Sequence, residues 1–127
     1  MAVQFVGRID REIYRCVTED ITTDEVIITE ERIQHIQDHH PNDYERFVHH
    51  MAEIVADPDY ILEANKPNTA VILKEFEENG EKFKLILRLK VERDPKEYRN
   101  SIISFWYIGE TTWKKALKNK KILYKRE

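Results

Sequence analysis

The sequence predicts an α+β fold in which early helices pack on one face of an antiparallel sheet. Two helical stretches separated by Pro41 come first, and three apolar runs of strand character follow. Asn79-Gly80 lies between two of these runs and favours a tight hairpin turn. Because helices precede an antiparallel meander, the order indicates α+β. A chain of 127 residues fits one domain, so we expect a single domain over residues 1–127.

Composition limits the classes of protein that the chain can represent. Charged residues make up 35% and apolar residues 41%, as in globular proteins. No apolar run approaches the roughly 20 residues needed to cross a bilayer, and the N-terminus is too polar for a secretory signal. We therefore expect a cytoplasmic protein with no membrane partner. Cys16 is the only cysteine, which excludes an internal disulfide and a Cys/His metal cage.

Residues 1 to 28 hold three short apolar patches. Val26–Ile28 and Ile13–Val17 are expected to form strands. The first patch, Val3–Val6, is left open because Gly7 interrupts a poor alternation. These assignments place the first strands ahead of both helices.

The two helices lie between Thr29 and Asp57. Thr29 is suited to cap the first helix, and Pro41 prevents regular continuation past His40. A second helix can restart after Asn42 or Asp43. Its predicted buried stripe consists of Phe47, Met51, Ile54 and Val55.

The second half of the chain reads as strands. Tyr60–Leu62 is expected to form a short strand, residues 65 to 68 a loop, and residues 69 to 92 a hairpin. A two-residue type I′ turn would place Glu75 opposite Lys84 and Val71 opposite Arg88. The predicted core face of the second strand consists of Phe83, Leu85, Leu87, Leu89 and Val91.

Three basic residues of this hairpin draw attention. Arg88 and Lys90 share the outer face without a carboxylate opposite, so their charges are expected to be free for a phosphate. The alternative is that Arg88 pairs with Glu92 or Asp94. Lys74 lies on the apolar face. Either the strand bulges there or the amine reaches a site at the margin of the sheet.

The last strand, helix and short strand complete the fold. Asn100 to Gly109 is aromatic and β-branched enough for a central strand, with Ser104, Ile102 and Trp106 expected on one face. Thr111 or Thr112 can cap a final helix through Trp113, Ala116 and Leu117. Ile122–Tyr124 should form a last short strand.

Charge is distributed unevenly along the chain. Residues 114 to 127 carry seven Lys or Arg and one Glu, a net charge of +6, whereas the first 113 residues carry −9. A basic tail on an acidic body is typical of a protein that meets a polyanion on one side. We predict that this tail, with Tyr124 and Lys125 near its end, contacts nucleic acid together with Arg88 and Lys90. A solvated amphipathic helix is the alternative.

All five histidines lie between residues 35 and 50. His35 and His39 stand one helical turn apart, close to the inverted zincin spacing H-x-x-E-H with Asp38 in place of Glu. A catalytic zinc ion needs a third protein ligand, and no histidine follows His50. We therefore expect no metal and no cofactor, and keep a zinc hydrolase as a lesser alternative.

Histidines also support metal-independent cleavage of RNA. One imidazole can take the proton of a ribose 2′-hydroxyl while a second protonates the departing 5′-oxygen. The phosphate then needs cations and hydroxyl donors around it. The candidate catalytic residues are His35, His40, Arg88 and Ser104. The candidate substrate-binding residues are His39, Lys74, Lys90, Trp106, Tyr124 and Lys125.

Several segments together resemble a known family. In order they are ITEERIQHIQDHHP, ADPDYILE, a hairpin ending in LILRLK, NSIISFW and KILYK. This order resembles phage-borne barnase/EndoU/colicin/RelE-like (PBECR) nuclease-fold domains over about residues 25 to 127. The resemblance implies helix-end roles for His35 and His40, a basic role for Arg88 and a hydroxyl role for Ser104. It also implies a nuclease fold.

Two functions follow from these observations. The first is a metal-independent ribonuclease that acts by 2′-hydroxyl attack, with tRNA-directed or toxin-like action left open, and with an inhibitor or immunity protein as a further partner. The second is a catalytically inactive copy of the fold that binds RNA or a protein.

Overall fold

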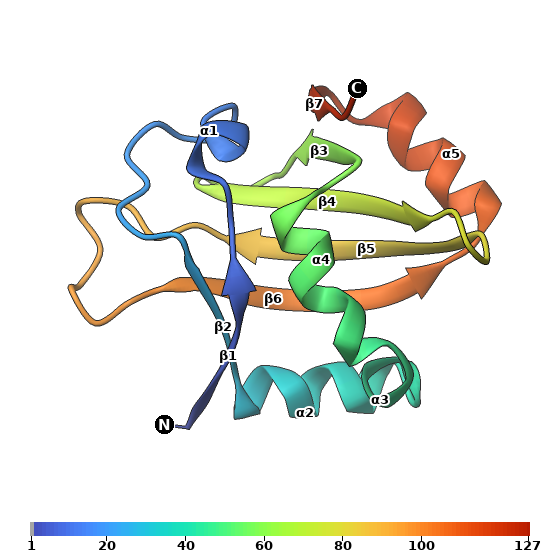
Figure 1. Cartoon of the computed structure of the whole chain (residues 1–127), viewed down its shortest axis with the longest axis horizontal. Coiled ribbons are helices and arrows are strands. Elements are labelled where there is room, and N and C mark those ends of the chain that lie inside the picture. The colour runs from blue at the N-terminus through green and yellow to red at the C-terminus, as the bar shows by residue number, and fades with distance from the viewer. Residues whose placement is uncertain (1) are drawn as a thin grey trace.

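The computed structural model describes residues 2–127 and shows one seven-stranded sheet with helices on both faces (Figure 1). The strand order is β1-β2-β6-β5-β4-β3-β7, and all neighbouring pairs are antiparallel except β2 and β6. The α+β prediction is thereby confirmed. The strands are β1 Val3–Arg8, β2 Glu25–Thr29, β3 Tyr60–Glu63, β4 Thr69–Phe76, β5 Glu81–Arg88, β6 Asn100–Ile108 and β7 Ile122–Lys125. The helices are α1 Arg11–Tyr14, α2 Glu30–His39, α3 Asp43–Phe47, η1 Val48–His50, α4 Met51–Ala56 and α5 Glu110–Asn119.

The first third of the chain differs from the prediction. Residues 13 to 17 are not a strand, because the short helix α1 begins at Arg11 and a turn follows it. The Asp10 carboxylate caps this helix by accepting from the Glu12 N–H at 2.9 Å. Tyr14 is fully buried, and its hydroxyl donates to the Val55 carbonyl at 2.8 Å. A local cap and a tertiary hydrogen bond thus override β propensity.

The helix start and stop around Pro41 are confirmed. The Thr29 hydroxyl accepts from the Arg32 N–H at 3.2 Å, and α2 ends at His39. The chain reverses through Asn42, whose φ of 76° lies in the left-handed region that Asn tolerates better than most residues. The predicted buried stripe of the following helices is buried as expected. This reversal fixes where His39 and His40 stand.

The hairpin forms, but with another register. Phe76 pairs with Glu81 and Glu75 with Lys82, so four residues form the turn instead of two. Gly80 adopts a φ of 71°, and the Asn79 side chain accepts from the Glu81 N–H. The register slips by two residues, and an even slip keeps every side chain on its predicted face. The predicted core face of β5 is correct for that reason.

Strand β6 contains a bulge that the alternation did not reveal. Ile86 pairs with Ser104 and Leu87 with Ile102, which leaves Ile103 as the extra residue. Ile102 and Phe105 therefore both point into the core, whereas Ser104 and Trp106 point to the opposite face. The expectation that Ile102, Ser104 and Trp106 share one face is wrong for Ile102.

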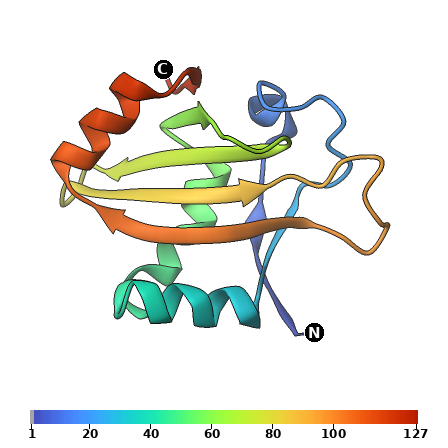
Figure 2. The same cartoon turned by 180° about the vertical axis from the view of Figure 1, so that it is seen from behind.

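Two apolar clusters lie on the two faces of the sheet. Helix α4 crosses the face in front in Figure 1, over the main core that includes Ile54, Ile72 and Phe83. Helix α5 begins at Glu110 with Gly109 as its N-cap, two residues before the predicted cap, and covers the other face through Trp113. Seen from behind in Figure 2, parts of β4, β5 and β6 lie open between α5 and α2. Within residues 2–127 no helix has the length and apolar character to cross a membrane.

Candidate functional site

A cleft of about 660 Å³ lies on the sheet face opposite α4. Its floor comes from the outer faces of β4, β5 and β6, and its walls come from α2, from the loop before β4 and from the end of α5. Apolar side chains such as Val71, Ile86 and Ile103 cover much of the floor. The basic lining residues are Arg32, Lys66, Lys84, Arg88 and Lys120.

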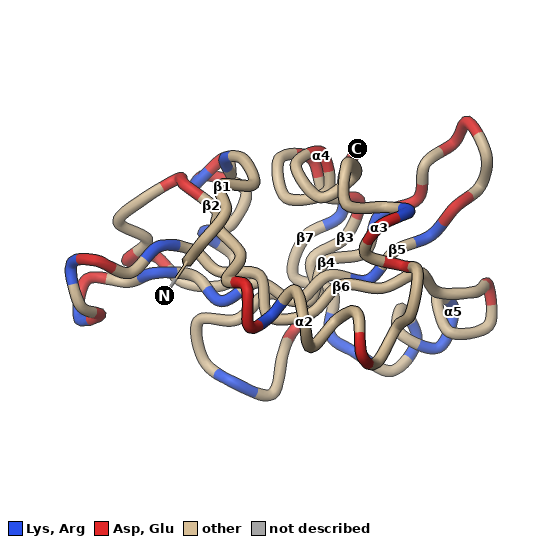
Figure 3. Tube along the Cα trace, turned by 90° about the horizontal axis from the view of Figure 1, so that it is seen from below, with Lys and Arg blue, Asp and Glu red and all other residues tan. Residues whose placement is uncertain are grey.

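These five residues carry positive charge and no acidic residue lines the cleft. Within residues 2–127 no ion pair is found for Arg32, Lys66, Lys84 or Lys120. Burial lowers the pKa of Lys84, and the nearby charge of Lys120 lowers it further. In Figure 3 helix α5 carries blue Lys segments, whereas the tip of the β4–β5 hairpin is red. Binding of an anion would reduce the electrostatic repulsion between these basic side chains. We call this cleft the basic cleft.

Lys82 and Lys84 differ in whether a carboxylate lies beside the ammonium group. Both residues lie on the same face of β5, but Lys82 contacts Glu110 at 2.8 Å and Glu75 at 3.3 Å. The hydrogen bond that the Lys82 ammonium donates to Glu110 raises the pKa of Lys82, opposite to the direction at Lys84. The predicted pair between Glu75 and Lys84 is therefore wrong.

Arg88 is not free of carboxylates. Its guanidinium makes a two-pronged contact with Asp94, at 3.1 Å for each pair of atoms, and also donates to the Leu89 carbonyl. The hydrogen bond from the Val91 N–H, with the charge of Arg88, lowers the pKa of Asp94. The expectation of an unpaired Arg88 is wrong. Its Nε and the second hydrogen on Nη2 still have no protein acceptor among the described residues.

Helix α2 carries a basic residue and two histidines along one side. Arg32 lines both the basic cleft and a small pocket that also contains His35. The rings of His35 and His39 lie 4.2 Å apart, and the His39 Nδ1 donates to the His35 carbonyl at 3.0 Å. This hydrogen bond leaves the His39 Nε2 as its basic nitrogen when the ring is neutral. The α2 wall thus places imidazoles beside a cleft cation.

His40 caps the C-terminal end of the same helix and does not itself line the cleft. Its ring stacks on Trp106 at 5.2 Å with an angle of 1° between the planes. The Lys84 ammonium lies 5.2 Å from the centre of the same Trp106 ring. His40 and Lys84 are thereby held against one indole. The structure brings His35 next to Arg32 and places His40 and Lys84 against the same Trp106 ring, but among the described residues it shows no direct contact from either histidine to Arg88 or Ser104.

The lining of the basic cleft does not include three of the predicted site residues, Ser104, Lys90 and Tyr124. Ser104 faces the same side as Trp106 and pairs with Ile86, but it does not line the cleft. Lys90 is almost buried beside Asn100, which accepts from its N–H. Tyr124 packs on the main core instead.

The basic tail does not form one surface. Lys120 lines the basic cleft, but Lys114 contacts Glu110 and Arg126 contacts Asp57. Lys125 lies on the outermost strand, β7, and is exposed. Of the described basic residues of the predicted tail, Lys120 alone lines the cleft.

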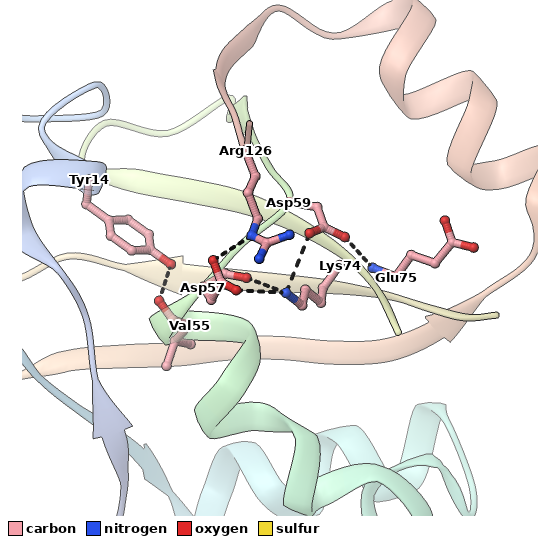
Figure 4. A network of polar contacts seen from close by, with 7 residues as sticks. All are labelled: Tyr14, Val55, Asp57, Asp59, Lys74, Glu75 and Arg126. Atoms are coloured by element: carbon pink, nitrogen blue, oxygen red, sulfur yellow. Dashed lines mark hydrogen bonds and ion pairs between the residues drawn. The ribbon is translucent and has the colours of Figure 1, made fainter. Parts of the chain in front are cut away.

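Lys74 lies on the opposite face, in an acidic groove that includes Glu53, Asp57 and Asp59. The side chain is almost fully buried and β4 does not bulge, so the second of the two expectations for Lys74 applies. Its ammonium donates to the Asp57 carbonyl at 2.7 Å and contacts both aspartate carboxylates at 3.4 and 3.5 Å, as Figure 4 shows. All three of its hydrogens have acceptors. Lys74 therefore has no part in the basic cleft.

No three His, Cys, Asp or Glu side chains of residues 2–127 are close enough together to hold a metal ion. The pair His35 and His39 has no third ligand beside it in this part of the chain. The His39 Nδ1 is also occupied by the backbone carbonyl of His35. This geometry does not favour the inverted zincin alternative.

Three basic residues of the cleft, Arg32, Lys66 and Lys84, were not singled out from the sequence as site residues, whereas Lys120 belongs to the predicted basic tail. The four come from different parts of the chain, and the fold alone brings them together. The sequence allowed one indication that Lys84 lacks a carboxylate partner. If the hairpin turn has four residues instead of two, Glu75 pairs with Lys82, and Lys84 lies opposite Leu73.

The comparisons with known proteins agree with this architecture. Residues 3–125 match the family described as phage-Barnase-EndoU-ColicinE5/D-RelE like nuclease2. No curated protein and no solved structure matches the chain. The matched segment covers nearly all of the 127 residues, including α2, the hairpin and every residue of the basic cleft. The chain therefore belongs to this family of phage-associated nucleases.

Proposed function

We propose that the protein is a metal-independent ribonuclease of the cytoplasm that cuts RNA at the basic cleft. The observation that carries this proposal is the set of five basic side chains with no acidic one among the described lining residues, next to a helix that carries two histidines and is followed by a third. Phosphates are the anions that such a cleft fits, because each brings negative charge and several acceptor oxygens. RNA is the proposed substrate.

The reacting phosphate would lie near Arg32, Lys84 and Arg88. Arg88 is oriented by Asp94, so its remaining N–H groups are fixed in direction before a substrate arrives. Lys84 and Arg32 have no carboxylate partner to give up on binding. Such preorganised charge stabilises the negative charge that grows on the phosphoryl oxygens in the transition state.

His35 and His40 are the proposed proton-transfer groups. One takes the proton of the 2′-hydroxyl while the 2′-oxygen forms a bond to phosphorus. The bond from phosphorus to the 5′-oxygen breaks, and the other histidine protonates that oxygen. The products are a 2′,3′-cyclic phosphate and a free 5′-hydroxyl. Because the attacking group is the 2′-hydroxyl, DNA would bind in the cleft without being cut.

Ser104, His39 and Trp106 have supporting roles in this proposal. Trp106 holds the His40 ring through stacking. Ser104 offers a hydroxyl on the same face of β6, and His39 packs on His35. Whether the target is tRNA, and whether the activity is toxin-like with an inhibitor protein to restrain it, belongs to the same proposal.

Cleavage of RNA in a chelator tests the proposal directly. The purified protein is incubated with total RNA and with a short single-stranded RNA in excess EDTA, and the ends of the products are identified. We expect cyclic phosphate ends and no cleavage of the matching DNA. His35→Ala and His40→Ala should each lower the rate about 10²–10⁴-fold, since each removes one proton transfer.

His49→Ala is the matched control. His49 lies in η1 and contacts the neighbouring His50, outside the cleft and its α2 wall. Its removal should leave cleavage unchanged. Tight, salt-sensitive binding of RNA without any cleavage would overturn the ribonuclease proposal and favour the binding module of the same fold. Activity that EDTA abolishes and zinc restores would favour the zinc hydrolase.

A further inference from the structure

The basic cleft has two walls, and three of its cations stand on them. Arg32 stands on α2, and it also lines the small pocket that contains His35. Lys66 stands on the loop after β3, and Lys120 at the C-terminal end of α5. Figure 2 shows α5 and α2 on opposite sides of the exposed strands. Among the described residues that line the cleft there is no histidine, so His35 stands beside the cleft, next to Arg32.

The floor separates the two walls by several strands. From β6, where Ile103 lines the cleft, to β3, where Leu62 lines it, there are three strand steps. At about 4.8 Å for each step the floor is about 14 Å wide. A phosphate that reacts at the histidine wall is therefore too far from the opposite wall to be the principal ligand of Lys66 and Lys120.

The floor between the walls is apolar except for Lys84 and Arg88 on β5. Leu62, Val71, Ile86 and Ile103 line it, with Thr69 and Asn65 at its margin. The Thr69 hydroxyl is already paired, because it donates to the Pro67 carbonyl. An apolar floor between two basic walls fits a nucleoside flanked by phosphates, because bases bury well on apolar surface and phosphates do not.

We propose that Lys66 and Lys120 form a second phosphate site, which binds the phosphate next in the chain to the one that is cut. This inference rests on the ribonuclease proposal and names its substrate more closely: a single-stranded RNA with at least two phosphates, whose intervening nucleoside covers the cleft floor. Duplex RNA does not fit, since its bases are stacked and paired and cannot reach the floor.

The proximity of Lys120 to Lys84 gives this site a defined relation to the first one. The charge of Lys120 helps to lower the pKa of Lys84, so the two ammonium groups influence each other across the floor. An RNA substrate with two adjacent phosphates neutralises both groups of cations. A substrate with one phosphate leaves one group of cations unneutralised and should therefore react poorly.

The test compares substrates with one and with several phosphates. The parent protein should cut a single-stranded tetranucleotide at least tenfold more efficiently, by kcat/KM, than a dinucleoside monophosphate. Lys66→Gln and Lys120→Gln should each lower kcat/KM for the tetranucleotide about tenfold and leave that for the dinucleoside monophosphate unchanged. Lys118→Gln, on the same helix but outside the cleft, is the control and should change neither.

Binding separates failure of this inference from failure of the ribonuclease proposal. A tetranucleotide with 2′-deoxy sugars cannot be cut, and the salt slope of its affinity should fall by about 0.7 in each lysine variant. If the variants slow both substrates equally, or slow neither, the second phosphate site is wrong while the ribonuclease stands. If no RNA is cut by the parent, the ribonuclease proposal fails, and the binding slope alone decides whether Lys66 and Lys120 bind phosphate.

Discussion

Cations on the two faces of the sheet differ in whether a carboxylate stands beside them. In the acidic groove Lys74 is buried between Asp57 and Asp59, and Arg126 contacts Asp57 from the end of the chain. In the basic cleft on the other face no acidic residue is present, and Lys84 is held among other cations. The paired cations join α4, β3, β4 and the C-terminus. The unpaired cations have no carboxylate partner among the described residues and are available to a ligand.

The largest effect is expected at Lys74. Lys74→Met removes an ammonium with three acceptors and leaves two carboxylates close together, so we expect a loss of about 2–3 kcal/mol in the free energy of unfolding. Urea denaturation measures it. RNA affinity of the folded protein should not change. A variant that is as stable as the parent would show that the acidic groove does not hold the fold together.

Replacing Asp94 tests the role of Arg88, the cleft cation that Asp94 pairs with. Asp94→Asn should lower the free energy of unfolding by about 1–2 kcal/mol and the rate of RNA cleavage severalfold, because Arg88 loses its orienting partner. The pKa of Asp94 is lowered in the folded protein, so its contribution is present above the ordinary value of 3.8 and is lost as the pH falls through the lower folded value. Unfolding measured from pH 5 downward should therefore show a parent that converges on Asp94→Asn. Parallel curves would contradict this role.

Lys84 and Lys82 should respond to pH in opposite directions. The pKa of Lys84 is lowered, so the parent gains stability relative to Lys84→Gln as the pH rises from that value toward 10.5. The pKa of Lys82 is raised, so its stabilising contribution is fully present below 10.5 and is lost above it. Chemical denaturation of both variants between pH 8 and pH 11 measures the two trends. Equal trends would mean that the two lysines have similar surroundings.

Trp106 gives the smallest expected effect. Trp106→Leu keeps an apolar side chain but removes the stacking that holds His40, so kcat should fall about three- to tenfold with KM nearly unchanged. Tyr107→Leu is the matched control, because Tyr107 is the next residue of β6 and stacks on Phe47 instead. An equal loss in both variants would remove the special role of Trp106.

The sequence predicted the elements better than the site, and the hairpin shows why. Period-two alternation assigned every residue of β5 to its correct face, because a slip of two residues does not change the face. The same slip gave Lys84 a glutamate partner that belongs to Lys82. Arg88 was expected to be free because the strand opposite offers no carboxylate, whereas Asp94 approaches from the following loop, as the alternative interpretation had it. Charge pairing depends on register and loops, which periodicity does not determine.

Other differences have equally local causes. The bulge at Ile103 shifted one half of β6, and no Gly or Pro marked its position. Residues 13 to 17 have β propensity but follow an Asp that caps a helix. The histidine segment was predicted well because Thr29 and Pro41 are strong local signals. The basic cleft draws on four elements, which only tertiary structure unites.

Salt dependence of RNA binding tests the central contrast most directly. The affinity of a fluorescent single-stranded oligonucleotide with 2′-deoxy sugars is measured over a range of salt for the parent, Lys84→Gln and Lys82→Gln. These two lysines lie on one face of one strand and differ in their carboxylate partners. We predict a slope smaller by about 0.7 for Lys84→Gln and an unchanged slope for Lys82→Gln. Equal slopes in the two variants would contradict the claim that the unpaired cations bind the nucleic acid.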